Sequence, residues 1–304
     1  MKILFFGTPY FAEIVLKGLV ESEFEVVGVV CQEDKPAGRG NKMQSPHIVQ
    51  VAKEYNIPVY QFEKLSRYIE EFKKIDYDYA VTASYGKILP KALLEIKPCI
   101  NVHPSMLPKY RGATPIQTAL LNGDTKTGVT IMKTNVGMDD GDIYVQQEEA
   151  ILPDDDYNSL IVKLGLVGLN LLLQTLRKIA NGEAKLIPQN HEEATFVKMI
   201  SKEDALLDFS KPAEQLVNMV RAYVENPVAY FFLGEDRIKV YHARVFDRTI
   251  EHGPGEVIST KKKFLIQAQD GVIEILRCQA PGGKVLDSNS FLNGYHFKSM
   301  VATI

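Results

Sequence analysis

Short segments of apolar residues alternate with helical segments through the first half of the chain. KILFFG (2–7), EVVGVVC (25–31) and CINVH (99–103) each have the length of a β-strand. After the first of these, apolar residues recur at four-residue intervals behind Thr8 and Pro9, which predicts a helix with Thr8 as its N-cap. Apolar strands that alternate with helices are typical of a parallel sheet covered on both faces. The first half is therefore predicted to be an α/β domain with a Rossmann-like, doubly wound, mostly parallel sheet.

The length of the chain and a change in its composition predict two domains. With 304 residues, the chain exceeds what one hydrophobic core usually serves. The sequence becomes polar and irregular over 188–206, which predicts a linker between a first domain at 1–187 and a second at 207–304. The second domain contains short β-rich segments separated by Gly, Asp and Pro, a pattern typical of a small antiparallel barrel.

Charge, cysteine usage and hydropathy exclude several classes of protein. The net charge of −3 argues against a broad nucleic-acid-binding surface, so RNA contact has to rest on local basic clusters. Cys31, Cys99 and Cys278 lack metal-ligand spacing, so neither a disulfide nor a zinc site is expected. The longest apolar runs, such as 164–173, are short and interrupted by Gly, so no membrane span is expected. A cytoplasmic protein fits these observations best.

Asn101 and His103 lie two residues apart at the end of a predicted strand. At this spacing both side chains project from one face of the strand, and Pro104 ends it at the carboxyl edge of the sheet. Open α/β sheets bind ligands at that edge. A carboxylate, Asp139 or Asp142, follows in a loop bounded by glycines, where an Asx turn is the alternative role. An amide, an imidazole and a carboxylate are the groups that acyl transfer to an amine requires.

Other strand ends and loops offer weaker signals. Gly7 stands alone where a dinucleotide-binding fold has GxGxxG, which disfavours a nicotinamide-dependent dehydrogenase. The segment SYGKILP (84–90) ends another strand at the same edge, although it is also compatible with a plain turn and Leu89 in the core.

The segment 32–46 is a long loop rich in Gly, Pro and basic residues. Lys35, Arg39 and Lys42 place three positive charges on it. Such a loop is either a solvated connection or a segment that orders against phosphates.

The stretches NVHPSMLPKYRGATPIQ and GVTIMKTNVGMDDGD closely resemble the formyltransferase family that uses 10-formyltetrahydrofolate. The Asn-x-His-x-Ser-x-Leu-Pro core and the downstream aspartate are the signature of that family. FFGTPYFA, DKPAGRG, SYGKILPKALLE and ATFVKMISKEDALLDFS extend the resemblance almost from end to end. These four segments point to the members of the family that formylate charged initiator tRNA.

The resemblance implies roles for particular residues. The catalytic amide, imidazole and carboxylate fall on Asn101, His103 and Asp139, with Asp139 preferred over Asp142 because the family's acid precedes x-Gly. The folate cosubstrate is expected to contact Ser105, Met106, Leu107, Pro108, Ile88 and Leu89. The acceptor tRNA is expected to contact Lys35, Arg39 and Lys42. A smaller C-terminal domain, an OB-like β-barrel, is expected to grip the tRNA.

The implied reaction is transfer of the formyl group of 10-formyltetrahydrofolate to the α-amino group of methionyl-initiator tRNA, for translation initiation, by a monomer without metal. Two alternatives stay open: a formyltransferase acting on a small amine such as an amino sugar nucleotide, and a non-catalytic RNA-binding protein with a degenerate folate site. The chain departs from the family's pattern in Pro104 and in having no tryptophan. The second departure leaves aromatic stacking in the C-terminal domain to Tyr223, Tyr230 or Phe231.

Overall fold

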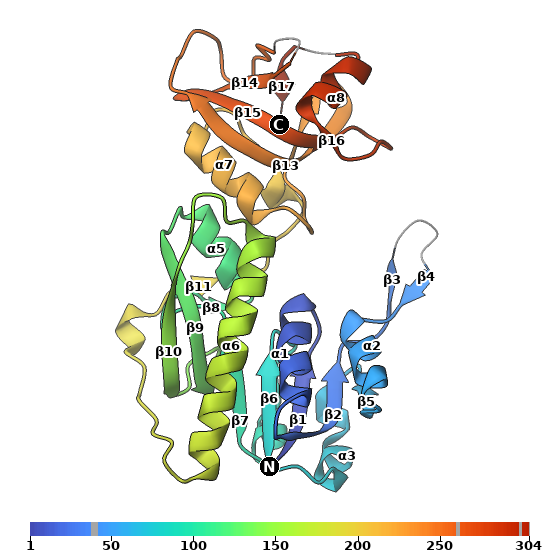
Figure 1. The fold of residues 1–304 in the computed structure, drawn as a ribbon, viewed down its shortest axis with the longest axis vertical. Coiled ribbons are helices and arrows are strands. Elements are labelled where there is room, and N and C mark those ends of the chain that lie inside the picture. The colour runs from blue at the N-terminus through green and yellow to red at the C-terminus, as the bar shows by residue number, and fades with distance from the viewer. Residues whose placement is uncertain (38–41, 260–261, 298–299, 304) are drawn as a thin grey trace. The chain divides into compact units, whose positions relative to one another are not determined.

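A computed structural model describes residues 1–37, 42–259, 262–297 and 300–303 of the chain. These residues form two compact units (Figure 1). The first unit consists of Met1–Pro115, Lys126–Ala150 and Leu160–Lys198, and the second of Ile116–Thr125, Ile151–Ser159 and Met199–Ile304. The second unit therefore takes two short segments from the middle of the chain in addition to the C-terminal part.

A twisted sheet forms the centre of the first unit. In the described part of the chain its strands are β1 (Lys2–Gly7), β2 (Glu25–Cys31), β5 (Val59–Gln61), β6 (Tyr79–Ala83), β7 (Cys99–His103), β9 (Lys126–Lys133) and β10 (Ile143–Ala150). Their order is β10-β9-β7-β6-β1-β2-β5. Strands β7, β6, β1, β2 and β5 pair in parallel, and β9 and β10 are antiparallel. The prediction of a Rossmann-like, mostly parallel sheet is confirmed.

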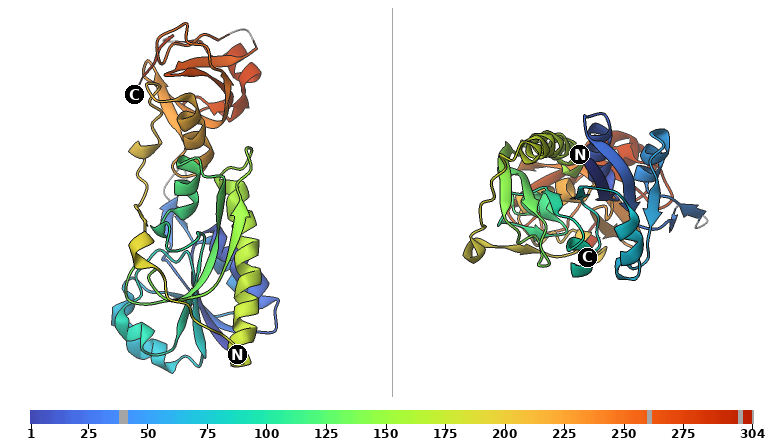
Figure 2. Two further views of the ribbon diagram at one scale, coloured as in Figure 1. Left: turned by 90° about the vertical axis from the view of Figure 1, so that its left-hand side faces the viewer. Right: turned by 90° about the horizontal axis from the view of Figure 1, so that it is seen from below.

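Helices cover both faces of this sheet (Figure 2). One face carries α1 (Tyr10–Val20), α2 (His47–Glu54) and α6 (Tyr157–Ala180). The other face carries the 3₁₀ helix η1 (Leu65–Arg67), α3 (Ile69–Lys74) and α4 (Lys91–Leu94). Under this second group, Phe6 of the central strand packs with Phe72 and Tyr85. Burial on both faces explains why the central strands are continuously apolar.

The start of α1 differs from the prediction. The helix begins at Tyr10 with Pro9 at the N-cap position, so Thr8 does not cap it. The Thr8 hydroxyl instead accepts a hydrogen bond from the backbone N–H of Gln32 (3.2 Å) and donates one to the carbonyl of Tyr85 (3.4 Å). Thr8 therefore connects the carboxyl ends of three neighbouring strands.

Helix α6 contains the apolar run 164–173 and is longer than that run indicates. It has 24 residues, its most apolar 18-residue stretch has a mean hydropathy of 1.7, and by length and composition alone it could cross a membrane. In the first unit it packs closely on the sheet and on α1. A Cβ at Gly168 would lie 2.7 Å from Cγ1 of Val102, and one at Gly165 would lie 3.1 Å from the Ile14 side chain. Half of this 18-residue stretch is buried, which is typical of a helix with one face on a core.

The basic segment 32–46 contains a short hairpin, so the prediction of a continuous loop was wrong. In it, β3 (Lys35–Ala37) pairs antiparallel with β4 (Lys42–Gln44). At its base, the Asp34 carboxylate accepts hydrogen bonds from the Ser45 hydroxyl (2.9 Å) and the Gln61 amide (2.8 Å), which lower the pKa of Asp34. Strands this short, with lysine and proline in them, have no apolar pattern that would reveal them.

The second unit is a curled antiparallel sheet. Its described strands are β12 (Tyr230–Leu233), β13 (Asp236–Asp247), β14 (Phe264–Ala268), β15 (Gly271–Gln279), β16 (Leu286–Asp287) and β17 (Ala302–Thr303). The order is β14-β15-β13-β12-β17, with β16 beside β15. The N–H of Val257 donates to Met300 O (2.8 Å) and that of Ile258 to Leu265 O (3.0 Å), so this segment bridges the two edges of the sheet. The predicted small β-domain is confirmed.

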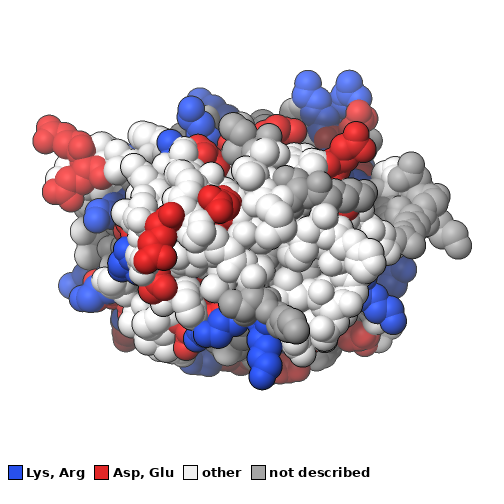
Figure 3. All heavy atoms as spheres, turned by 90° about the horizontal axis from the view of Figure 1, so that it is seen from above, with Lys and Arg blue, Asp and Glu red and all other residues white. Residues whose placement is uncertain are grey.

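Short helices accompany this sheet. They are α5 (Pro115–Leu121), η3 (Glu203–Ala205), α7 (Ala213–Ala222) and α8 (Ser288–Gly294). Tyr223, Tyr230 and Phe231 are buried, so the expectation that they stack on a ligand was wrong. Figure 3 shows lysine and arginine side chains in separate groups toward the rim of the view, with aspartate and glutamate side chains between them.

Candidate active site

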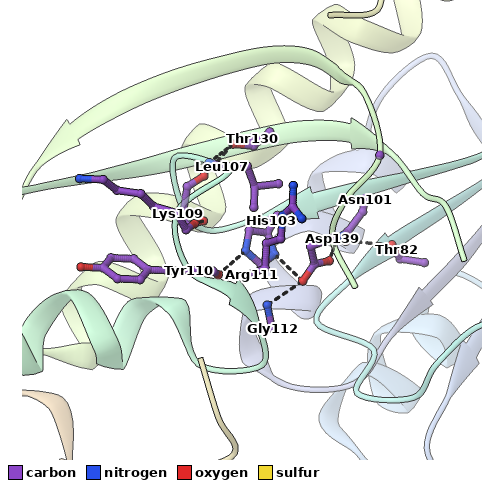
Figure 4. Close-up of polar contacts among 12 residues, drawn as sticks. Thr82, Asn101, His103, Leu107, Lys109, Tyr110, Arg111, Gly112, Thr130 and Asp139 are labelled. Atoms are coloured by element: carbon purple, nitrogen blue, oxygen red, sulfur yellow. Dashed lines mark hydrogen bonds and ion pairs between the residues drawn. The ribbon is translucent and has the colours of Figure 1, made fainter. Parts of the chain in front are cut away.

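Asn101 and His103 lie on β7 at the carboxyl edge of the sheet (Figure 4). Asn101 is paired with Thr82 of β6, and His103 with Thr130 of β9. Because the two residues are separated by one position on a strand, their side chains share a face, as predicted. His103 is buried and Asn101 is partly exposed.

Asp139 lies in the loop between β9 and β10 and meets both of these side chains. Its Oδ1 accepts a hydrogen bond from Asn101 Nδ2 (3.2 Å), and its Oδ2 lies 3.7 Å from His103 Nδ1. Oδ2 also accepts a hydrogen bond from the backbone N–H of Gly112 (2.8 Å). For Asp142, the contact described is one of the backbone, because its carbonyl accepts the N–H of Lys133. The structure thus brings together the amide, the imidazole and Asp139.

The orientation of the His103 ring is set by a backbone carbonyl. Nε2 lies 3.0 Å from Tyr110 O, and because a carbonyl only accepts, Nε2 carries the proton. Tyr110 has a left-handed φ of 61°, and its N–H donates to the Thr195 hydroxyl (2.8 Å). In this orientation Nδ1 is the ring nitrogen that faces Asp139. A protonated Nδ1 would place a positive charge beside the carboxylate.

The turn after β7 is stabilised from within. The Thr130 hydroxyl donates to Ser105 O (2.7 Å) and accepts from the N–H of Leu107 (3.1 Å), while Gln146 Nε2 donates to Leu107 O (2.7 Å). The side chains of Ser105 and Leu107 are buried, and Met106 and Pro108 are partly exposed.

The two candidate residues that follow β6 point in different directions. Ile88 is 83% exposed, which is unusual for an isoleucine, whereas Leu89 is buried in the core cluster with Phe72 and Leu93. Of this pair, only Ile88 offers its side chain to a ligand.

Two functional candidates were missed by the sequence analysis. Arg111 on β8 (Arg111–Gly112) and Gln189 after α6 are both buried. Gln189 hydrogen-bonds to the Asp139 loop and to Arg111. Strand β8 pairs in parallel with β11 (Phe196–Val197), so the segment 187–198 runs beside the site. A single Gln in a polar segment carries no sequence signal, and a buried polar side chain becomes visible only in the structure.

The basic residues proposed for tRNA contact are only partly described. Lys35 Nζ donates a hydrogen bond to Gln32 Oε1 (2.8 Å). Arg39 lies outside the described residues, and only the backbone of Lys42, in β4, is described.

Metal and thiol chemistry find little support in the part of the chain that the structure describes. No group of three or more His, Cys, Asp or Glu side chains there could hold a metal ion. Cys31, Cys99 and Cys278 are buried, and burial raises the pKa of each thiol to about 12. A neutral, buried thiol is a poor nucleophile.

Comparison with known proteins identifies the family. Residues 1–176 match the family model for formyl transferase, and residues 199–296 match the model for the formyl transferase C-terminal domain. The chain belongs to the formyl transferase family.

Individual relatives agree with this assignment. The chain is 43% identical over 292 residues, 94% of both chains, to a methionyl-tRNA formyltransferase from Kosmotoga olearia. HypX from Aquifex aeolicus, solved in complex with tetrahydrofolic acid, has a similar fold, with a TM-score of 0.69 at 18% identity. That match covers 96% of this chain and 47% of the HypX chain. The N-formyltransferase from Helicobacter canadensis, solved with folinic acid and dTDP-3-aminofucose, matches with a TM-score of 0.68 at 20% identity, over 90% of this chain and 98% of its own.

Proposed function

We propose that this protein transfers the formyl group of 10-formyltetrahydrofolate to the α-amino group of methionyl-initiator tRNA, for translation initiation. The observation that carries the proposal is the convergence of Asn101, His103 and Asp139 at the carboxyl edge of the sheet. The acceptor follows from the resemblance to methionyl-tRNA formyltransferases, which extends over nearly the whole chain. The cytoplasmic location and the monomeric state stay predictions.

Asn101 is assigned to the oxyanion. Attack by the neutral α-amine forms a new C–N bond and puts negative charge on the formyl oxygen. The Asn101 amide nitrogen carries two N–H groups, of which one is donated to Asp139. The second N–H is the one that we assign to the developing oxyanion. A donor in this role is typically worth ~2.7–4 kcal/mol of transition-state stabilisation.

His103 and Asp139 are assigned to the proton. One proton has to leave the attacking amine and reach N10 of the folate as the C–N10 bond breaks. Nε2 of His103 is held by Tyr110 O, so Nδ1 is the ring nitrogen that takes part. The 3.7 Å between Nδ1 and the Asp139 carboxylate is too long for a hydrogen bond, and the carboxylate is placed to stabilise a protonated Nδ1 across that gap.

The two substrates are assigned to different parts of the first unit. The folate is placed against the turn 105–108 and Ile88, whose exposed side chain offers an apolar surface. The side chains of Ser105, Leu107 and Leu89 are buried. Lys35, Arg39 and Lys42 of the segment 32–46 are assigned to the phosphates of the tRNA.

The test is a formyl-transfer assay with 10-formyltetrahydrofolate and three acceptors: charged initiator tRNA, glycinamide ribonucleotide and an amino sugar nucleotide. Transfer to the tRNA alone is expected. Transfer only to a small amine would keep the site and replace the acceptor. Binding of folate without transfer to any of the three would contradict the proposed reaction.

A further inference from the structure

Gln189 is buried, and both the nitrogen and the oxygen of its side-chain amide form hydrogen bonds. It lies between α6 and the 3₁₀ helix η2 (His191–Glu193), and only 6% of its surface is exposed. Its Nε2 donates hydrogen bonds to two carbonyls of one loop, Asp139 O at 2.9 Å and Gly141 O at 2.7 Å. The two N–H groups of this one amide therefore hold two carbonyls of the loop, that of Asp139 itself and that of Gly141, two residues later.

The other end of this amide is anchored by Arg111. Gln189 Oε1 accepts hydrogen bonds from Arg111 Nη2 (2.7 Å) and Nε (3.2 Å), and Arg111 is 4% exposed. Nη2 also lies 3.0 Å from Nδ1 of His191, which accepts because a guanidinium only donates. The neighbouring Gly112 donates its N–H to the Asp139 carboxylate. Two consecutive residues of β8 thus support Asp139. Gly112 binds its carboxylate directly, and Arg111 anchors Gln189, which binds its carbonyl.

Asp139 needs such support because of its backbone. Its φ of 47° lies in the left-handed region, which is unfavourable for a residue with a side chain. A conformation of this kind persists where surrounding contacts hold it. For Asp139 these contacts are the Gln189 amide on its carbonyl, and Gly112 and Asn101 on its carboxylate.

We infer that Gln189 is a positioning residue for formyl transfer: through its two donated hydrogen bonds it holds the Asp139 carboxylate in register with Asn101 and His103. The inference rests on the proposed function, in which Asp139 acts next to the reacting atoms. Gln189 itself contacts the backbone of the loop and acts only through Asp139. Displacing a catalytic group by about 1 Å can lower turnover by about 10²-fold.

Two substitutions distinguish the hydrogen bonds that Gln189 donates to the loop from those that it accepts from Arg111. Gln189→Glu keeps an oxygen for Arg111 but replaces the donor by an acceptor that faces two carbonyls, and Gln189→Met removes both functions. Both variants are expected to lower kcat by about 10- to 100-fold, with KM for either substrate changed less than about threefold. Gln174→Glu, the same change at an exposed position of α6, is the control and is expected to leave kcat unchanged. A wild-type kcat in Gln189→Glu would overturn the inference.

A double-mutant cycle tests whether Gln189 acts through Asp139. Asp139→Asn alone is expected to lower kcat. Adding Gln189→Glu to it is expected to lower kcat by less than a further factor of about two, because residues that act as a unit are not additive. A fully multiplicative loss would show an independent, structural role and would overturn the inference.

Hydrogen exchange gives a readout that does not depend on catalysis. Amides of residues 136–142 are expected to exchange at least about tenfold faster in Gln189→Glu than in the wild type, while those of β7 stay protected. Unchanged exchange in that loop contradicts the inference whatever the activity. If the wild type transferred no formyl group, the proposed function would fail, and the exchange rates would still decide whether Gln189 holds the loop.

Discussion

The hydroxyl of Thr82 donates a hydrogen bond to Oδ1 of Asn101, 2.9 Å away, across the paired strands β6 and β7. On the other side of the same amide, the Asp139 carboxylate can only accept, so Nδ2 has to face it. The two contacts together fix which end of the Asn101 amide points toward the site. Thr82, which was not a candidate in the sequence analysis, therefore helps to decide whether Asn101 presents an N–H donor to the site.

Thr82→Val removes this hydroxyl and keeps the shape of the side chain. We expect kcat to fall roughly 2- to 10-fold, the equivalent of one hydrogen bond of about 0.5–1.5 kcal/mol. Thr127→Val on β9 is the matched control, because the Thr127 hydroxyl is buried without a hydrogen-bond partner in the described structure. Steady-state kinetics of both variants decide the point, and equal activities would show that Thr82 does not orient the amide.

Asn101→Ala removes the proposed oxyanion donor. Turnover is expected to fall by ~10²–10³, while folate affinity stays within a few fold, because the donor acts mainly in the transition state. Single-turnover kinetics and a folate-binding titration measure the two quantities separately. Unchanged turnover would remove Asn101 from the mechanism.

Arg39→Ala tests the role of the basic segment 32–46 in tRNA binding. The variant is expected to raise KM for charged tRNA and to leave kcat at saturating tRNA unchanged, because a phosphate contact contributes to docking. Each lost phosphate contact should reduce the slope of log affinity against log salt by about 0.7–0.9. Lys73→Ala, which removes an exposed lysine paired with Glu70 on α3, serves as the control. Loss of turnover at saturating tRNA would instead place the segment in catalysis.

The three cysteines are expected to be inert in the folded protein. Burial raises the pKa of Cys31, Cys99 and Cys278 to about 12, so all three thiols stay protonated from pH 7 to 9. Thiolates form in quantity only as the pH approaches those raised values. A thiol-specific reagent at pH 8 should label the protein only after denaturant is added. Rapid labelling of the native protein, with loss of formyl transfer, would contradict this expectation.

The sequence pattern was most informative where burial decides the choice of residue. Strands β1, β2 and β7 are covered on both faces and were visible as apolar segments. Strand β10 was missed because it lies at the edge of the sheet and its second half, QQEEA, is mostly exposed. Nothing in such a polar segment distinguishes a strand from a loop.

In the candidate site, too, some contacts could be predicted from the sequence and others could not. Asn101 and His103 share a strand end, so their spacing alone predicted that they lie together. The approach of Asp139 followed only from the resemblance, and Gln189 could not be predicted, because it lies 78 residues from its anchor Arg111. Hydrogen bonds between such distant, single polar residues leave no periodic trace in a sequence.

The segments 116–125 and 151–159 belong to the second unit although they lie within the sequence of the first. There, Arg221 of α7 donates hydrogen bonds to Asp155 O (2.7 Å) and Leu152 O (3.0 Å). Cutting the chain between residues 198 and 199 would therefore leave the guanidinium of Arg221 and these carbonyls on separate fragments. A graft of the C-terminal part onto another formyl transferase would keep these hydrogen bonds only if the two internal segments were transplanted with it.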